Sequence, residues 1–229
     1  MSNSHYQELD KLIQEYEDDK KSYHPDKLII KNYPKLFVMS VASTFEYYIK
    51  DRIKDFVASP ANPINTTYPQ IDSLFAYKPR TPMSDKMYSK FIASDRDGIE
   101  RLDAGEFYAL FGGASFKGLV TTKFEEERTR RRSQAEGMLN SLSALIGTDD
   151  KFDLDYAKYS DIKERLDLCT FEKAEIAFLS LKLRRNKVAH NYLNGLSDSF
   201  EDVRNFYYDA ISYVIALEES ILSVTASPA

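Results

Sequence analysis

The sequence predicts an all-α protein built around a bundle of long helices. Three observations favour this fold class. Apolar residues recur at spacings of three and four along most of the 229 residues, as they do on the buried face of a helix. Five of the eight prolines fall between residues 58 and 82, which marks a loop there. No stretch has a convincing strand pattern, and no internal repeat is visible.

The first part of the chain predicts two helices. The first begins near Ser4, which forms a capping box with Gln7, and ends before the His24-Pro25 pair. The second covers about residues 26–57 and contains Pro34, which either kinks it or marks its first turn. Its period is kept by Phe37, Val41, Phe45, Tyr48, Ile53 and Phe56.

The middle of the chain predicts a loop followed by shorter elements. The proline-rich loop at 58–82 has three interpretations: a lid, a contact arm for a partner, or an ordered surface loop, which is the favoured one. Short helices are expected near residues 87–92 and 99–111, and a long one over 115–146. Residues 148–169 are polar and predict only one short helix, over 159–168. We expect a single domain over 1–229, with 58–114 as an insertion.

An arginine-rich run at residues 125–132 permits two interpretations. Arg128, Arg130, Arg131 and Arg132 could hold phosphates. Alternatively, glutamates four positions earlier pair with Arg130 and Arg131, giving a self-neutralised exposed face. The second interpretation is favoured, because exposed ion pairs of this kind are common.

The most informative segment is a predicted helix over about residues 171–196. Thr170 is suited to cap its start and Gly195 to end it. At 100° per residue, one stripe faces the core, formed by Ala174, Ala177, Leu181 and Val188. His190 and Asn186 lie one turn apart on another side, and Arg185 lies between that side and the core stripe. A final helix is expected over 198–224.

Composition excludes several classes of function. The net charge of −5 is unlike that of a general nucleic-acid coating protein, so any RNA contact must come from a local patch. The single cysteine, Cys169, excludes an internal disulfide and predicts a reducing, cytoplasmic location. No apolar run predicts a membrane span or signal peptide. No cluster has the spacing of a metal site and no cofactor is implied, while the nucleophile-elbow motif of a serine hydrolase is absent from the sequence.

The combination of Arg185, four intervening residues and His190 resembles the Arg-x(4–6)-His motif of HEPN domains. Tyr192 extends it to the Arg-x4-His-x-Tyr form of HEPN toxins that are paired with nucleotidyltransferase antitoxins. A second similarity is Glu46, which follows an aromatic residue within a long helix, as in the first core helix of many HEPN proteins. The resemblance covers roughly half the chain, and the size is closer to the cyanobacterial-type and RiboL-PSP-type groups than to the minimal toxins.

The resemblance implies a metal-independent endoribonuclease that acts as a homodimer. Histidine can exchange protons near neutral pH, and a guanidinium can stabilise a charged phosphorane. Asn186 would orient the imidazole or donate to a phosphate, and Glu46 would hold the arginine. Tyr192 would be the residue that an antitoxin modifies. Arg184 gives a spacing of five, so the assignment of the motif arginine to Arg185 could shift by one.

Other interpretations of these residues remain open. His190 could bond a last carbonyl of its helix, Tyr192 could belong to the core, and Glu46 could be a buried partner of an arginine. The expected function is an RNA-cleaving toxin or effector of a bacterial defence or toxin–antitoxin system, with an antitoxin or defence protein as a possible partner. The alternatives are a non-catalytic HEPN-like module that binds RNA or a protein, and a helical scaffold that binds no RNA.

Overall fold

The computed structural model describes residues 4–22, 28–59, 108–109, 111–190 and 196–226. Within these residues the secondary structure is helical and no strand occurs, which confirms the predicted all-α class. The proline-rich loop and the two short helices expected near 87–92 and 99–111 fall almost wholly outside the described residues. The proposed insertion at 58–114 therefore stays a prediction.

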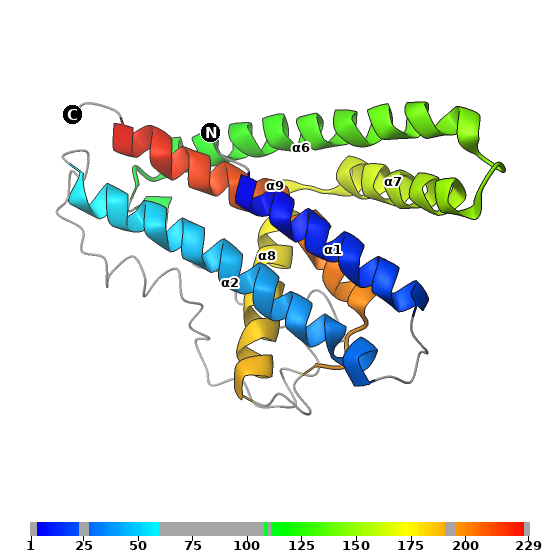
Figure 1. Ribbon diagram of the computed structural model, residues 1–229. Helices are drawn as coiled ribbons and strands as arrows, with labels where there is room; N and C mark the ends of the chain where they lie inside the picture. The colour runs from blue at the N-terminus through cyan, green and yellow to red at the C-terminus, as the bar shows by residue number, and fades with distance from the viewer. Residues whose placement is uncertain (1–3, 23–27, 60–107, 110, 191–195, 227–229) are drawn as a thin grey trace. The chain divides into compact units, whose positions relative to one another are not determined.

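The described helices follow one another along the chain as Figure 1 labels them. In order, they are α1 (Ser4–Ser22), α2 (Leu28–Ala58), α6 (Ala114–Leu142), the 3-10 helix η1 (Ser143–Leu145), α7 (Asp150–Leu168), α8 (Phe171–His190) and α9 (Phe200–Ala226). Among them, no segment combines the length and the apolar composition that a bilayer span requires.

The chain divides into two compact units. The first comprises Met1–Tyr47 and Arg128–Val214, and the second comprises Tyr48–Glu127 and Ile215–Ala229.

The core of the first unit is aromatic and joins α1, α2, α8 and α9. The ring of Phe45 on α2 lies 5.8 Å from Tyr6, 6.4 Å from Phe178 and 6.0 Å from Tyr207, measured between ring centroids. All four side chains are almost fully buried. Contacts between aromatic rings stabilise the folded state beyond the effect of burying their apolar surface. Because Phe45 makes three such contacts, it is central to the core of this unit.

A glycine turn precedes α6 in the second unit. Gly112 and Gly113 have positive φ angles of 118° and 66°. Residues that carry a Cβ atom rarely adopt such angles, so glycine is favoured at both positions. The turn is closed by the Gly113 N–H, which donates to the Tyr108 carbonyl at 2.8 Å. It brings Phe111 within 4.7 Å of Phe56 and 4.8 Å of Phe116, between ring centroids.

Helix α7 is longer than the sequence predicts. The expectation of one short helix over 159–168 is wrong, because α7 begins at Asp150. Its start is fixed by the Asp149 side chain, which accepts a hydrogen bond from the Lys151 N–H at 2.8 Å. Leu166 is the one residue of α7 that is fully buried. The apolar periodicity that would reveal the helix is consequently weak.

The arginine run lies against neighbouring helices of the first unit. Figure 1 shows α7 alongside the C-terminal half of α6, where Arg128 donates to the Leu166 carbonyl at 3.1 Å and Arg132 forms an ion pair with Asp167. Arg131 approaches Asp10 of α1 at 3.9 Å. The favoured interpretation of a self-paired exposed face is therefore wrong for Arg131, because its nearest carboxylate belongs to another helix.

Helix α8 carries the predicted core stripe. Its four residues, Ala174, Ala177, Leu181 and Val188, are at most 3% exposed, which confirms the stripe. The Thr170 hydroxyl accepts from the Lys173 N–H at 3.2 Å, as expected of the cap. Every residue from 177 to 184 is buried, so the middle of α8 has no solvent-facing side. The helix is exposed in its first turn, at Glu172 and Lys173, and again in its last turns.

Candidate active site

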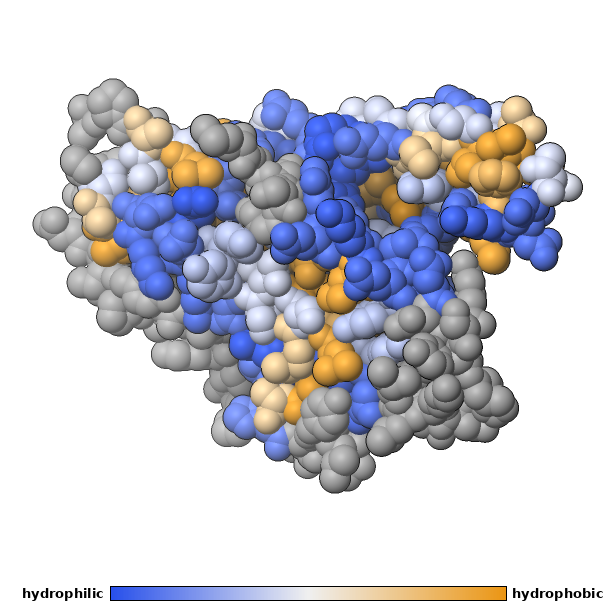
Figure 2. All heavy atoms as spheres, in the orientation of Figure 1, coloured by the Kyte–Doolittle hydropathy of each residue, from blue (hydrophilic) through white to orange (hydrophobic). Residues whose placement is uncertain are grey.

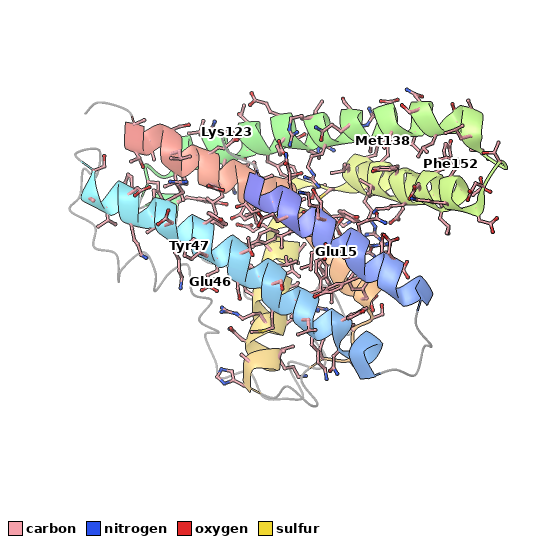
Figure 3. The ribbon with its side chains drawn as sticks, viewed as in Figure 1. Glu15, Glu46, Tyr47, Lys123, Met138 and Phe152 are labelled. Carbon is pink, nitrogen blue, oxygen red and sulfur yellow. The ribbon has the colours of Figure 1, made fainter. Side chains whose placement is uncertain are left out.

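Arg185 is held by a carboxylate on a different helix. Its Nη2 atom donates to Oε2 of Glu46, which lies near the middle of α2 (Figure 3). The two side chains are 24% and 13% exposed. A guanidinium donates from several nitrogens, and its Nε is buried with no hydrogen-bond partner among the described residues. The pair thus fixes the cation while leaving donor capacity unused.

Asn186 and His190 lie on the exposed side of the last turns of α8. Both are exposed, as is Ala189 between them. Counting 100° per residue, His190 points about 170° away from the centre of the core stripe, and Asn186 about 150° away. The imidazole is therefore reachable by solvent and is not buried among the apolar side chains of the residues that the structure describes.

The structure brings some of the predicted residues together and leaves others apart. Arg185 meets Glu46, and Asn186 shares an exposed side with His190. Within the described part of the chain, no hydrogen bond joins Arg185 to His190. The two are about 140° apart around the helix axis and about 7.5 Å apart along it. Tyr192 lies outside the described residues.

Arg184 has a separate, buried environment. Its Nε and Nη2 atoms donate to Oδ1 of Asp198 at 3.0 and 2.9 Å. Its guanidinium also lies 4.0 Å from the ring centroid of Phe206. Side-chain exposure is 3% for Arg184 and 7% for Asp198. The donors of Arg184 are thus used inside the fold, which favours Arg185 as the cation available to a substrate.

Sequence reasoning missed the two partners of Arg184. Asp198 and Phe206 belong to the segment before α9 and to α9 itself. Relative to the core stripe of α8, Arg184 and Arg185 both lie about 50° from its centre, on opposite sides. Helical periodicity therefore cannot tell which arginine is buried, and only the tertiary partners decide it.

The side chains at this site can supply acid–base and electrostatic chemistry. Among the described residues, no group of three or more His, Cys, Asp or Glu side chains is placed to hold a metal ion. An exposed imidazole can take up or release a proton, and a positioned guanidinium can bind an anionic oxygen. Cys169 is buried and donates to the Asp209 carbonyl at 3.4 Å, so its thiol belongs to the interior.

Comparison with known proteins identifies the family. Residues 3–223 match the family model described as RiboL-PSP-HEPN, so the match contains every candidate residue. Neither the curated proteins nor the solved structures include a significant match. Because the family match runs over nearly the whole chain, the protein belongs to the RiboL-PSP-HEPN family, which makes it a nuclease-type or RNA-related helical module.

Proposed function

We propose that the protein is a metal-independent endoribonuclease whose active residues are Arg185, Asn186 and His190. The observation that carries the proposal is the arrangement of the last turns of α8. An exposed imidazole follows a guanidinium that a carboxylate from α2 holds in place. Membership of the RiboL-PSP-HEPN family supports an RNA-directed activity.

In the proposed reaction, a ribose 2′-hydroxyl attacks the adjacent phosphate. His190 accepts the hydroxyl proton, and a protonated imidazole returns a proton to the departing 5′-oxygen. Arg185 stabilises the negative charge that develops on the phosphorane oxygens. Asn186 orients the imidazole or donates to a phosphate oxygen. The products are a 2′,3′-cyclic phosphate and a 5′-hydroxyl.

The proposal includes a homodimer. Arg185 and His190 of one chain point in directions about 140° apart, so one copy supplies a sparse site. Two copies that pair through the last turns of α8 would let the imidazole of one chain and the guanidinium of the other meet at one phosphate. We further propose a cytoplasmic toxin or effector role, controlled by an antitoxin or defence protein, with Tyr192 as a modification site. The resemblance to HEPN toxins supports this context.

The test is RNA cleavage by purified full-length protein in the presence of EDTA. We expect cleavage fragments that end in 2′,3′-cyclic phosphate. Arg185→Ala and His190→Ala should each lower the rate by about 100-fold or more, because each removes a group that acts in the transition state. Lys173→Ala is the matched control, since it removes an exposed cation from the first turn of the same helix and should leave the rate unchanged.

The folded state of each variant is checked by circular dichroism and thermal unfolding. Cleavage that persists in both alanine variants would reject the site. RNA binding without any cleavage by the wild-type protein would instead favour the non-catalytic module.

A further inference from the structure

A cavity lies in the first unit, and no residue of α8 lines it. It has a volume of about 400 Å³ and is lined by residues of α1, α6, α7 and α9. Figure 2 shows the surface hollowed between α1 and the α6–α7 pair, with hydrophilic residues at its border. This volume is at the lower end of the range for small-molecule sites, which suits a ligand of mononucleotide size.

Arg131 supplies the cavity with a guanidinium that has unused donors. Its side chain is only 14% exposed, and its Nε is buried with no hydrogen-bond partner among the described residues. The carboxylate of Asp10 is 3.9 Å from Nη2, which is too long for a hydrogen bond. Asp10 instead accepts from the hydroxyl of Tyr207 at 2.8 Å.

The charges around the cavity favour an anion. Lys11, Arg131 and Lys158 line it, against the single carboxylate of Asp10. Lys158 is also paired with Glu17 of α1 at 3.1 Å, so the net excess of positive charge is small and is centred on Arg131 and Lys11. The planar fork of a guanidinium matches the geometry of phosphate oxygens.

The remaining walls suit a flat, partly apolar group. Met138, which Figure 3 labels on α6, and Ile162 of α7 supply apolar surface. Gln134 is exposed at the rim, and its amide can both donate to and accept from the edge of a base. Burial raises the pKa of the Tyr159 and Tyr208 phenols, so both present neutral hydroxyl groups at physiological pH.

We propose that the cavity between α1, α6, α7 and α9 binds a nucleoside phosphate monoester, with Arg131 holding the phosphate and Met138 and Ile162 contacting the base. The ligand is either a free mononucleotide or the 5′-terminal nucleotide of an RNA. This inference goes beyond the proposed cleavage reaction and does not depend on it.

The experiment is isothermal titration of full-length protein that carries His190→Ala, which removes the imidazole proposed to cleave RNA. AMP should bind saturably, and adenosine and inorganic phosphate should each bind at least about tenfold more weakly, because each lacks half of the ligand. Arg131→Gln should weaken AMP binding by about tenfold or more through loss of charge-assisted hydrogen bonds. Gln134→Glu should also weaken it, because it adds a carboxylate at the rim.

Arg132→Gln is the matched control. It removes the neighbouring guanidinium on α6, which pairs with Asp167 and Glu136 and does not line the cavity. AMP affinity should stay within about twofold of the parent protein. If thermal unfolding shows that Arg131→Gln does not fold, Gln134→Glu at the exposed rim decides the question.

A second set of titrations distinguishes a free mononucleotide from the 5′ end of an RNA as the ligand. A short 5′-phosphorylated RNA that binds more tightly than both AMP and its 5′-hydroxyl form identifies an RNA end as the ligand. AMP binding equal to or tighter than that of the phosphorylated RNA identifies a free nucleotide. The proposal is overturned if neither AMP nor the phosphorylated RNA saturates the protein. It is also overturned if inorganic phosphate binds as tightly as AMP, or if Arg131→Gln and Gln134→Glu both leave the affinity unchanged.

Discussion

Arg184 and Arg185 are adjacent in the sequence but contact different parts of the fold. Arg184 is buried, donates twice to Asp198 and stacks on Phe206. Arg185 is half-buried and pairs with Glu46 on α2. A buried guanidinium whose donors are bonded contributes to the fold, whereas a partly exposed one held by a single carboxylate can meet a phosphate. The proposed division of roles follows from these partners.

Glu46 should act as a positioning residue for Arg185. Glu46→Gln removes the charge that fixes the guanidinium, and we expect RNA cleavage to fall about ten- to 100-fold, because small misplacements of a catalytic group have large effects on rate. The free energy of unfolding should fall by only about 1–2 kcal/mol. The loss should appear mainly in kcat, with KM for RNA little changed. Cleavage assays and urea unfolding measure the two effects.

Glu15→Gln on α1 is the control for Glu46, because Glu15 is exposed (Figure 3). It removes the same charge and should change neither quantity appreciably. A Glu46→Gln variant with wild-type cleavage would show that Arg185 needs no partner on α2.

Asp209 on α9 makes stability depend on pH. Burial raises its pKa, although Lys173 and Arg165, at 3.6 and 3.9 Å, act in the opposite direction. The folded chain therefore keeps this proton at a pH where the unfolded chain has lost it. The contribution to stability is present below the unfolded carboxyl pKa of about 4, and it is lost as pH rises through the raised folded value.

Asp209→Asn should remove this part of the pH dependence. The amide keeps the shape of the side chain but does not titrate, so the variant should gain stability relative to the wild type as pH rises from about 4 to 7. Urea unfolding at several pH values measures the difference in the free energy of unfolding. A variant that loses stability equally at both ends of this range would contradict the prediction.

At the scale of elements, the Arg184–Asp198 pair should stabilise the connection between α8 and α9. Arg184→Met leaves Asp198 buried without its cation and should lower the free energy of unfolding by about 3 kcal/mol or more. Arg185→Met should lower it by about 1 kcal/mol, since its pair is partly exposed. Urea unfolding of both variants gives the comparison. The assignment would be contradicted if the Arg184→Met variant were as stable as the wild type but did not cleave RNA, and the Arg185→Met variant cleaved it normally. The motif arginine would then be Arg184.

Local signals explain which elements the sequence could predict. The stripe and the Thr170 cap of α8 are visible because apolar spacing and capping depend only on nearby residues. Helix α7 lacks an apolar stripe, since Leu166 is its single fully buried residue. A usable signal was nevertheless present: Asp149 is a good cap, and Asp150 and Asp153 suit the first turn of a helix.

The candidate site was less predictable than the fold. The motif residues could be named from the chain, but whether a guanidinium is buried depends on residues far away in sequence. Arg184 is buried where it pairs with Asp198, and Arg185 is partly exposed where it pairs with Glu46, 139 positions away. No local pattern encodes such pairs, and only the resemblance to HEPN domains pointed to Glu46 as the partner of the arginine. The cavity beside Arg131 was also not predictable, because four separate helices line it.

At the scale of the whole molecule, the candidate site belongs to one compact unit. Glu46, Arg185 and His190 all fall within Met1–Tyr47 and Arg128–Val214. The family match nevertheless extends over residues 3–223, which includes most of the second unit as well. Cleavage assays should therefore use the full chain.

The proposed homodimer leads to a prediction about Tyr47. This side chain is 65% exposed and directly follows Glu46 on α2 (Figure 3), about 100° around the helix from the carboxylate that holds Arg185. Aromatic residues are enriched at the centres of protein interfaces. Tyr47→Glu adds a charge at an exposed position and should cost little stability in a single chain. We expect it to shift the protein towards monomer in analytical ultracentrifugation and to lower RNA cleavage about tenfold or more, in line with hot-spot residues.

The matched control is Leu154→Glu on α7, which places the same charge at another exposed apolar residue, 52% exposed. Because α7 contributes none of the proposed catalytic residues, this variant should keep the wild-type sedimentation and cleavage rate. Cleavage should also fall on dilution of the wild-type protein below its dimer dissociation constant, since the proposed site needs two chains. If the wild-type protein sediments as a monomer while it cleaves RNA at full rate, the proposal of a site shared by two chains is rejected. Arg185 and His190 of a single chain would then have to act together.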